Sequence, residues 1–569
     1  MTRAPLRPLA RVFSARAHGE DPDEIEAEAR AARARARHQA ERVQAETRLL
    51  LLAATFLLAF GAVALRMTAL AASDPVEPEA TQIASPIVAQ RADIVDRNGA
   101  ILATNLRTAS LYAQPHKMID KPAAAASLAA IFPELDEADL LRRFSGDRKF
   151  LWIKRTLSPE QKQAVHDLGE PGLQFGPREM RLYPNGRLAS HILGGYGFGR
   201  EGVHAAEVVG SAGLERRFDA YLRDPANGGA PLRLSIDLSV QAAVERVLAG
   251  GMRLMNAKGA AAVLMEARTG QIIALVSLPD FDPNKRPLPP SEGDPSDSPL
   301  FNRAAQGVYE LGSTFKIFTA AQALETGLAA PSTMIDTKGP LTWGRFRIRD
   351  LHNREKRLSL TDVIVKSSNI GTARIAVEIG AERQQAFLSD LGFLEPVPVS
   401  LPEASKTKPL LPKRWSEISV MTISYGHGLA ATPLHLATAY ASLVNGGLKV
   451  SPSLLADTPP PGEADRILSP ATSGILRQML RQVVQRGTAT LADVPGYRVG
   501  GKTGTADKPK HTGGYHEDKV IATFASVFPA HDPEYVLVVS LDEPEDRSGR
   551  EPRRTAGWTA PARARAPFP

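Results

Sequence analysis

An uncharged apolar run near the N-terminus constrains the arrangement of this chain more than any other feature. Leu49–Leu65 contains no charged residue, and the apolar character resumes after Arg66 as far as Ala72. At a rise of about 1.5 Å per residue, a helix over this stretch spans a hydrocarbon core of roughly 30 Å, with Arg66 reaching toward an interface. We therefore predict that residues 49–72 form a transmembrane anchor.

Basic residues set the predicted orientation of this anchor. Ten arginines lie between Arg3 and Arg48, and topology follows Lys and Arg rather than net charge. We expect residues 1–48 to form a cytoplasmic tail, with a charged helix possible over Glu24–Arg48, and everything after residue 72 to lie outside. A cleaved signal peptide is the alternative, because Ala69–Ala71 resembles a cleavage site. The basic region and the apolar run are both longer than a signal peptide needs.

Length and composition limit the number of domains and exclude several classes of function. The 569 residues leave room for two or three domains. The formal charge of +7 comes from basic residues spread along the chain, without zinc-finger spacing or RNA-binding aromatic motifs, so we do not expect nucleic-acid binding. The chain has no cysteine, which excludes disulfides, thiolate metal sites and a cysteine nucleophile. We see no cluster of metal ligands and expect neither a metal nor a cofactor.

Changes in residue composition and pattern divide the chain after the anchor into three segments. Residues 73–89 are rich in proline, acidic and small residues and read as a linker. Residues 90–230 mix short strand-like and helical runs, and residues 231–545 place helical tracts between strand-like runs at both ends. This order predicts an α+β fold in which helices cover an antiparallel sheet. The strand-like runs are 232–236, 261–265, 271–277, 520–528 and 535–541, and the helical tracts lie around 314–326, 360–380 and 433–444.

A short motif at the start of one helical tract carries the first chemical signal. Ser313 and Lys316 are three residues apart, directly after Gly312, and open an apolar helical run. Positions i and i+3 share a helix face, so the hydroxyl and the amine can lie within hydrogen-bonding distance. A helix N-terminus also favours developing negative charge. A second Ser-x-x-Lys, at Ser405–Lys408, lacks this context and is interpreted as a loop.

Two more motifs follow in order along the chain. Ser367-Ser368-Asn369 ends a helical tract, where a serine can relay a proton and the amide can bind a peptide carbonyl. Lys502-Thr503-Gly504-Thr505 follows two glycines, so a substrate backbone can approach and the lysine can hold a carboxylate. A second cation and desolvation both favour the neutral form of Lys316, which can then accept the serine proton. Each motif alone occurs in ordinary turns, and their order and spacing together indicate a catalytic site.

This ordered set resembles the serine penicillin-recognising enzymes. Residues 91–99 (RADIVDRNG) are similar to a box of class B penicillin-binding proteins, with Ala92 where that class usually has glycine. The segments 181–184, 191–194 and 213–215 resemble further boxes of its pedestal domain. The forms YELGSTFK (309–316), SYGHG (424–428) and TPL (432–434) are similar to the division-specific, FtsI-type branch.

The resemblance implies an elongated pedestal (dimerisation-type) domain over 90–230 and a serine β-lactamase-like transpeptidase domain over 231–545. It implies a peptidoglycan D,D-transpeptidase that cross-links stem peptides during septal cell-wall synthesis and is acylated by β-lactams. The implied location is the bacterial inner membrane, single-pass, with a periplasmic catalytic domain beside a SEDS-type glycosyltransferase and divisome membrane proteins.

The resemblance also assigns roles to single residues. Ser313, Lys316 and Ser367 are the implied catalytic residues, and the N–H groups of Ser313 and Thr505 form the implied oxyanion hole. The implied substrate-binding residues are Asn369, Lys502, Thr503, Gly504 and Thr505. Three alternatives stay open: a carboxypeptidase, an elongation-specific transpeptidase, and an idle scaffold or β-lactam sensor.

The C-terminus departs from the family pattern. The family continues past residues 542–544 with an amphipathic helix that packs on the sheet, whereas this chain ends in PARARAPFP. Proline and arginine cannot supply an apolar helical stripe. The ending resembles a truncation or frameshift. We expect residues 546–569 to form a disordered tail that leaves part of one sheet face uncovered.

Overall fold

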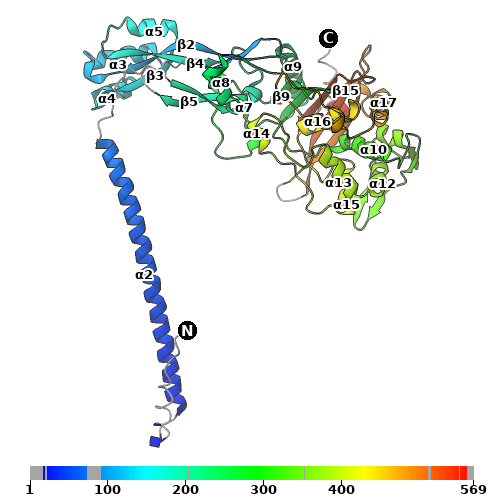
Figure 1. The fold of residues 1–569 in the computed structure, drawn as a ribbon, viewed down its shortest axis with the longest axis horizontal. Helices are drawn as coiled ribbons and strands as arrows, with labels where there is room; N and C mark the ends of the chain where they lie inside the picture. Colours follow the sequence, from blue (N-terminus) through cyan, green and yellow to red (C-terminus); the bar gives the residue numbers. More distant parts are fainter. Residues whose placement is uncertain are drawn as a thin grey trace. The chain divides into compact units, whose positions relative to one another are not determined.

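The computed structural model describes residues 14, 17–19, 22–72, 91–201, 206–351, 353–510, 514–549 and 552–559. The chain separates into two compact units, residues 1–84 and 85–569. The predicted linker, residues 73–89, lies outside the described residues. Figure 1 shows the ribbon of both units.

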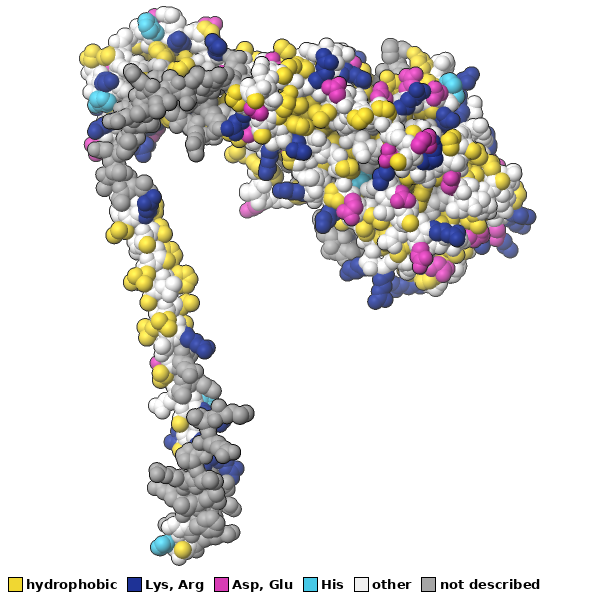
Figure 2. All heavy atoms as spheres, in the orientation of Figure 1, with side chains coloured by type: hydrophobic (Ala, Val, Ile, Leu, Met, Phe, Trp, Pro, Cys, Tyr) yellow, Lys and Arg dark blue, Asp and Glu magenta, His cyan; other side chains and the backbone are white. Residues whose placement is uncertain are grey.

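The first unit contains one long helix, α2 (Pro22–Ala72), of 51 residues. It takes in the predicted anchor and the basic stretch before it. Within α2, Glu46–Thr68 is long and apolar enough to cross a membrane, with a mean hydropathy of 2.2, and none of its most apolar window is buried inside the protein. Figure 2 shows hydrophobic side chains on both sides of this stretch. A helix that is apolar all round and has no protein core against it has the character of a membrane span.

The N-terminal part of the second unit is built around the long strand β2 (Ile101–Ala113). β2 pairs antiparallel with β4 along most of its length and with β3 toward its C-terminal end. Three helices cover these strands and bury Leu128, Phe132, Leu140 and Phe144 in a core of their own. The other strands are β1 (Ile94–Val95), β3 (Leu151–Leu157), β4 (Leu173–Leu182), β5 (Gly195–Glu201), β6 (Ala206–Ala212) and β7 (Leu232–Arg233), and the helices are α3 (Lys121–Ile131), α4 (Glu137–Ser145), α5 (Pro159–His166), α6 (Ser190–Leu193), α7 (Gly213–Arg217) and α8 (Asp219–Arg223).

The C-terminal part contains a five-stranded antiparallel sheet in the order β14-β15-β16-β8-β9. Its strands are β8 (Gly259–Glu266), β9 (Ile272–Leu278), β14 (Gly500–Pro509), β15 (Tyr515–Phe528) and β16 (Tyr535–Asp542). Every residue of β9 is buried, because helices cover the sheet (Figure 1). The predicted α+β architecture with a helix-covered antiparallel sheet is confirmed.

Three helices make the main contacts with this sheet. α9 (Leu238–Leu254) packs on β8 and β9, α16 (Pro433–Val444) packs on β8 and β16, and α17 (Pro470–Arg486) packs on β14. All residues of α16 are buried, as expected of a helix that is apolar on every side in a large domain. The remaining helices are α10 (Lys316–Glu325), α11 (Leu360–Val365), α12 (Asn369–Ile379), α13 (Ala381–Asp390), α14 (Pro402–Ser405), α15 (Glu417–Ile423) and α18 (Ala556–Thr559).

Two small strand pairs lie beside the helices. β10 (Met334–Asp336) pairs with β13 (Arg357–Ser359), and β11 (Leu341–Trp343) pairs with β12 (Phe346–Ile348). The β11–β12 hairpin packs the side chain of Ile348 with Ile370 of α12 and Met421 of α15 in a small core of its own. The sequence analysis did not anticipate these strands, because each has only three residues.

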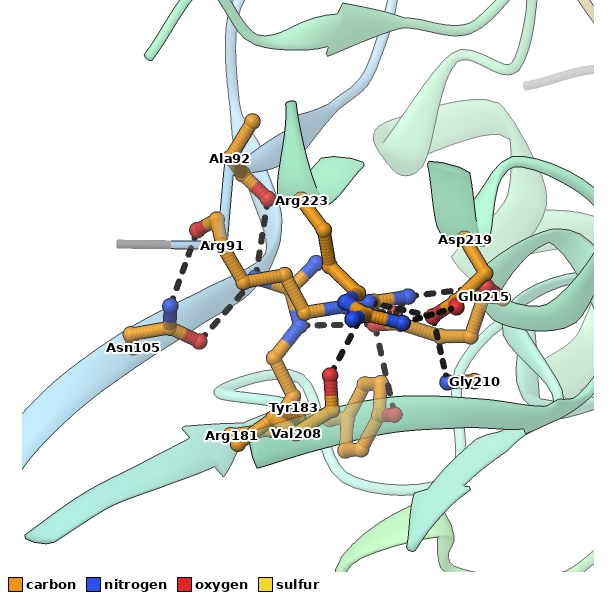
Figure 3. A network of polar contacts seen from close by, with 10 residues as sticks. All are labelled: Arg91, Ala92, Asn105, Arg181, Tyr183, Val208, Gly210, Glu215, Asp219 and Arg223. Atoms are coloured by element: carbon orange, nitrogen blue, oxygen red, sulfur yellow. Dashed lines mark hydrogen bonds and ion pairs between the residues drawn. The ribbon is translucent and has the colours of Figure 1, made fainter. Parts of the chain in front are cut away.

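A buried charge network joins the segments that resemble pedestal boxes (Figure 3). The Glu215 carboxylate accepts hydrogen bonds from Arg91 Nε at 2.7 Å and Arg181 Nε at 2.6 Å. A second carboxylate, Asp219, lies 2.7 Å from Arg91 Nη1, and the Tyr183 hydroxyl donates to Glu215. The side chains of Arg91, Arg181 and Glu215 are at most 2% exposed. Buried charges of this kind are tolerated when they are paired and hydrogen-bonded.

The C-terminal end differs from its prediction. Asp546 and Arg553 form a β-bridge, and the Arg554 guanidinium lies 2.6 Å from Glu545. Helix α18 packs against β14 and β15, and Ala556 is 1% exposed. These contacts of residues 546–549 and 552–559 differ from the predicted disordered tail, because the buried Ala556 and Thr559 fit against the sheet without an apolar stripe. Residues 550, 551 and 560–569 lie outside the described part.

The charge network gives a prediction about stability. We expect Glu215→Gln to lower the free energy of unfolding by about 3–5 kcal/mol, because Arg181 and part of Arg91 would keep buried positive charge without its anion. Thermal unfolding of the purified chain in detergent measures the effect. Glu292→Gln, in an exposed loop, is the control, and equal melting temperatures of the two variants would contradict the prediction.

Candidate active site

Ser313 lies in a tight turn that leads into helix α10. Gly312–Phe315 form a 3-10 turn, and α10 begins directly after it at Lys316. The expectation that Ser313 opens an α-helix is therefore off by one turn, although the two side chains still face each other. Lys316 Nζ lies 2.7 Å from Ser313 Oγ. Ser313 is partly exposed, whereas Lys316 is completely buried.

The Lys316 amine is surrounded by oxygen atoms. Besides Ser313 Oγ, its nitrogen lies 2.8 Å from the Ser367 carbonyl, 3.0 Å from Ser367 Oγ and 2.7 Å from Asn369 Oδ1. The carbonyl and amide oxygens can only accept, whereas the two hydroxyls can also donate. A neutral amine can therefore donate to the two carbonyl-type oxygens and accept a proton from a hydroxyl. The surroundings suit the neutral form that a base requires.

Ser367 occupies the turn between α11 and α12 in a strained conformation. Its φ is +59°, a left-handed value that is uncommon for residues other than glycine, asparagine and aspartate. This conformation places Ser367 Oγ 3.0 Å from Lys316 Nζ and 3.0 Å from Lys502 Nζ. One hydroxyl thus bridges two amines.

Lys502 comes to the site from strand β14. It is completely buried, and its amine also donates to the Thr503 carbonyl at 3.0 Å. Burial lowers the pKa of Lys502 to about 7. Burial also holds the pKa of Lys316 well below its ordinary value, and the nearby Lys502 charge lowers it further. Desolvation disfavours an ammonium and a like charge adds to this effect, so both causes favour a neutral Lys316.

Glycines allow β14 to lie directly against the 3-10 turn. A Cβ on Gly312 would overlap the carbonyl of Thr505, and a Cβ on Gly504 would overlap the carbonyl of Leu311. Gly312 also has a φ of +56°, which suits glycine. The close approach brings the Ser313 turn beside Thr505.

The threonines of the third motif have partners of their own. The Thr503 and Thr488 hydroxyls are 2.7 Å apart. The Thr505 hydroxyl accepts a hydrogen bond from the Ala556 N–H at 2.9 Å. The C-terminal segment therefore contacts this motif, which the sequence analysis did not foresee.

The structure brings together the predicted residues of all three motifs. The second Ser-x-x-Lys copy has a different environment, because Ser405 ends α14 and its hydroxyl donates to the Pro402 carbonyl at 2.9 Å. Sequence reasoning missed Asp350 and Thr488, which touch the motif residues Ser368 and Thr503. Neither belongs to a recognisable short pattern, and only the folded chain brings them near.

The close packing at Gly312 gives a second prediction. We expect Gly312→Ala to destabilise the protein by about 2–4 kcal/mol, which combines left-handed backbone strain with overlap against Thr505. Gly327→Ala is the matched control, because Gly327 also has positive φ but open space at its Cβ. The difference between the two variants in denaturant unfolding isolates the contact. Equal losses of stability would show that β14 does not press on the turn.

Comparison with known families covers most of the chain. Residues 260–557 match the penicillin-binding protein transpeptidase domain, and residues 86–229 match the penicillin-binding protein dimerisation domain. The two matched ranges follow one another along the second unit.

Individual relatives agree with the family matches. The chain is 37% identical to the probable peptidoglycan D,D-transpeptidase FtsI of Caulobacter vibrioides, over 84% of this chain and 81% of that protein. It is 28% identical to FtsI of Escherichia coli, over 80% and 79% of the two chains. A crystal structure of penicillin-binding protein 3 from Mycobacterium tuberculosis with aztreonam superimposes with a TM-score of 0.62 and 26% identity, covering 84% of this chain and 95% of that one. This chain belongs to the penicillin-binding protein transpeptidase family, as an FtsI-type class B member.

Proposed function

We propose that this protein is a serine peptidoglycan D,D-transpeptidase that cross-links stem peptides during septal wall synthesis, and that β-lactams acylate it. One observation carries the proposal: the Lys316 amine lies within hydrogen-bonding distance of both Ser313 Oγ and Ser367 Oγ, and Lys502 contacts the same Ser367 hydroxyl. The names of the relatives, which include peptidoglycan D,D-transpeptidases, support the choice of substrate.

The first step forms an acyl-enzyme. Neutral Lys316 accepts the hydroxyl proton of Ser313, and Ser313 Oγ attacks the carbonyl carbon of the penultimate D-Ala of a stem peptide. The bond to the terminal D-Ala nitrogen breaks, and the proton moves from Lys316 through Ser367 Oγ to that leaving amine. The N–H groups of Ser313 and Thr505 hold the oxyanion, and such donors are worth about 3 kcal/mol each.

The second step transfers the acyl group. An amine on a neighbouring stem peptide attacks the ester carbonyl, its proton passes through Ser367 Oγ to Lys316, and Ser313 Oγ leaves and takes that proton from Lys316. Thr503, Gly504 and Thr505 lie on β14, an edge strand of the sheet, and an extended peptide can pair with such an edge. In the first step, before the terminal D-Ala leaves, Asn369 orients the peptide carbonyl and Lys502 holds the terminal carboxylate.

The cellular setting is part of the same proposal. Helix α2 anchors the chain once in the inner membrane, with the basic N-terminus in the cytoplasm and the second unit in the periplasm. Transpeptidation follows glycan synthesis, so the anchor and residues 90–230 would contact a SEDS-type glycosyltransferase and divisome membrane proteins. The FtsI-type relatives support a division role over an elongation role.

The assignment of the nucleophile has a direct test. Ser313→Ala is expected to abolish covalent labelling by fluorescent penicillin and the formation of cross-linked peptide, because it removes the attacking oxygen and leaves Ser367 Oγ bridging the two lysine amines. Ser405→Ala, in the second Ser-x-x-Lys copy, should label like the unmodified protein. Mass spectrometry of the labelled peptide identifies the site. A penicilloyl group on another residue would refute the proposal, and turnover to shortened, uncross-linked stems would indicate a carboxypeptidase.

The pKa directions predict the pH dependence of acylation. Protonated Lys316 cannot accept the Ser313 proton, so the acylation rate should fall about tenfold per pH unit below the pKa of Lys316. The Lys502 charge lowers that pKa. Lys502→Gln should therefore move the midpoint of the acid limb to higher pH, in addition to slowing the reaction. Stopped-flow measurements with a chromogenic cephalosporin between pH 4 and pH 10 test this, and an unmoved limb would contradict the electrostatic coupling.

A further inference from the structure

The turn that carries Ser367 and Asn369 is held by a carboxylate outside all three motifs. Asp350 follows the β11–β12 hairpin. Its Oδ2 accepts the Ser368 hydroxyl at 2.6 Å, and its Oδ1 accepts the Ile370 N–H at 3.0 Å. Oδ2 also accepts from Asn353 Nδ2 at 3.1 Å. The carboxylate therefore contacts the residues on both sides of Asn369.

The same contacts organise the start of helix α12. Ser368 is the N-cap of α12, and its hydroxyl oxygen accepts the Gly371 N–H at 2.9 Å while its proton goes to Asp350. Ser368 is completely buried, so its hydroxyl has few other possible partners. A negative charge at a helix N-terminus is also favourable. Asp350 thus fixes the point at which the strained Ser367 turn becomes a helix.

Arg349, the residue before Asp350, also contacts the Ser367–Asn369 turn. Asn369 Nδ2 donates to the Arg349 carbonyl at 3.0 Å, while Asn369 Oδ1 accepts from Lys316. Both ends of the Asn369 amide are therefore held, one by the Arg349–Asp350 segment and one by the base. The hydrogen bonds of the segment reach the reacting groups through Ser368, Asn369 and Ile370.

We infer that Asp350 is a positioning residue for acylation. Its hydrogen bonds to Ser368 and Ile370 fix the turn between them and Ser367. This turn holds Ser367 Oγ and Asn369 Oδ1 against the Lys316 amine. The inference rests on the proposed function, because it gives Asp350 a part in the Ser313 reaction. Its contacts are short, directional and shared with a turn that has left-handed backbone strain, and such strain persists only where neighbouring contacts hold it.

Charge adds a second effect of the same residue. Two charged groups act on Lys316: Lys502, from β14, lowers its pKa and Asp350, from the hairpin loop, raises it. The other groups around the amine, which are Ser313, Ser367 and Asn369, are neutral. Removing the Asp350 charge therefore favours a neutral Lys316 at lower pH. Loss of the α12 cap alone, as in Ser368→Ala, leaves this charge in place.

The experiment compares Asp350→Asn with Asp336→Asn in the full chain. Asp336 lies nearby on β10, is exposed, and pairs with Arg374 at 3.1 Å. We expect Asp350→Asn to slow acylation of Ser313 by fluorescent penicillin about 10- to 100-fold, the range caused by small misplacements of reacting groups. We also expect its acid limb to move to lower pH. Asp336→Asn should leave both the rate and the limb unchanged.

Ser368→Ala separates positioning from general loss of structure. If Asp350 acts through Ser368, the double variant should be hardly slower than the Asp350→Asn variant, because the two changes break one contact. Thermal unfolding checks that the variants remain folded, and Asp350→Glu tests whether a carboxylate displaced by one methylene restores the limb but not the full rate.

The outcomes distinguish failure of the positioning role of Asp350 from failure of the proposed function. An Asp350→Asn variant that acylates like the Asp336→Asn variant would overturn the inference. So would a slower Asp350→Asn variant whose acid limb stays in place and whose loss of rate follows its loss of thermal stability. Failure of the unmodified protein to be acylated at Ser313 would instead reject the proposed function.

Discussion

The C-terminal part of this protein depends on the burial of two lysine amines around one serine hydroxyl. Lys316 and Lys502 are both 0% exposed, and Ser367 Oγ lies 3.0 Å from each of their nitrogens. An ammonium taken out of water without a carboxylate beside it is costly, and it responds by losing its proton more easily. The enclosure therefore favours a neutral Lys316 amine beside Ser313. Helix α10, the turn before α12 and strand β14 each supply part of that enclosure.

Burial of charge has the opposite consequence elsewhere in the chain. In the network of Arg91, Arg181 and Glu215, each buried charge meets an opposite charge within 2.7 Å. Paired charges of this kind tie distant segments together, which is a structural role. Around Ser367 the two amines have a hydroxyl and carbonyl groups as neighbours, and the Asp350 carboxylate bonds Ser368 and Ile370 rather than either amine. The difference in pairing explains why one buried cluster holds a domain together and the other can exchange protons.

Rigid elements hold the reactive groups in place. β14 is paired along its length with β15, and its glycines let it lie against the turn of Ser313 without an intervening side chain. The part of the site that α11 and α12 supply is less regular, because Ser367 adopts a left-handed conformation in the loop between these two helices. Asp350 contacts this loop through Ser368 and Ile370. Helix α16 contacts the 3-10 turn of Ser313, because the Tyr440 hydroxyl donates to the Thr314 carbonyl at 2.8 Å. The site is thus a junction of one sheet, one helix bundle and one small hairpin.

Local patterns in the sequence were enough to predict the long apolar helix, four of the five strands of the central sheet, the three motifs and the family, whereas β14 was not predicted as a strand. An apolar run reveals a membrane span, and a buried strand or a short motif is visible within a few neighbouring residues. The β10–β13 and β11–β12 pairs, the positive φ of Ser367, the contacts of Asp350 and the packing of α18 on β14 could not be predicted in this way. Lys316 meets Ser367 across 51 residues of chain, and Lys502 meets Ser367 across 135. Contacts over such separations form only when the whole domain packs. Their free energy depends on burial away from water, which segments distant in the sequence supply.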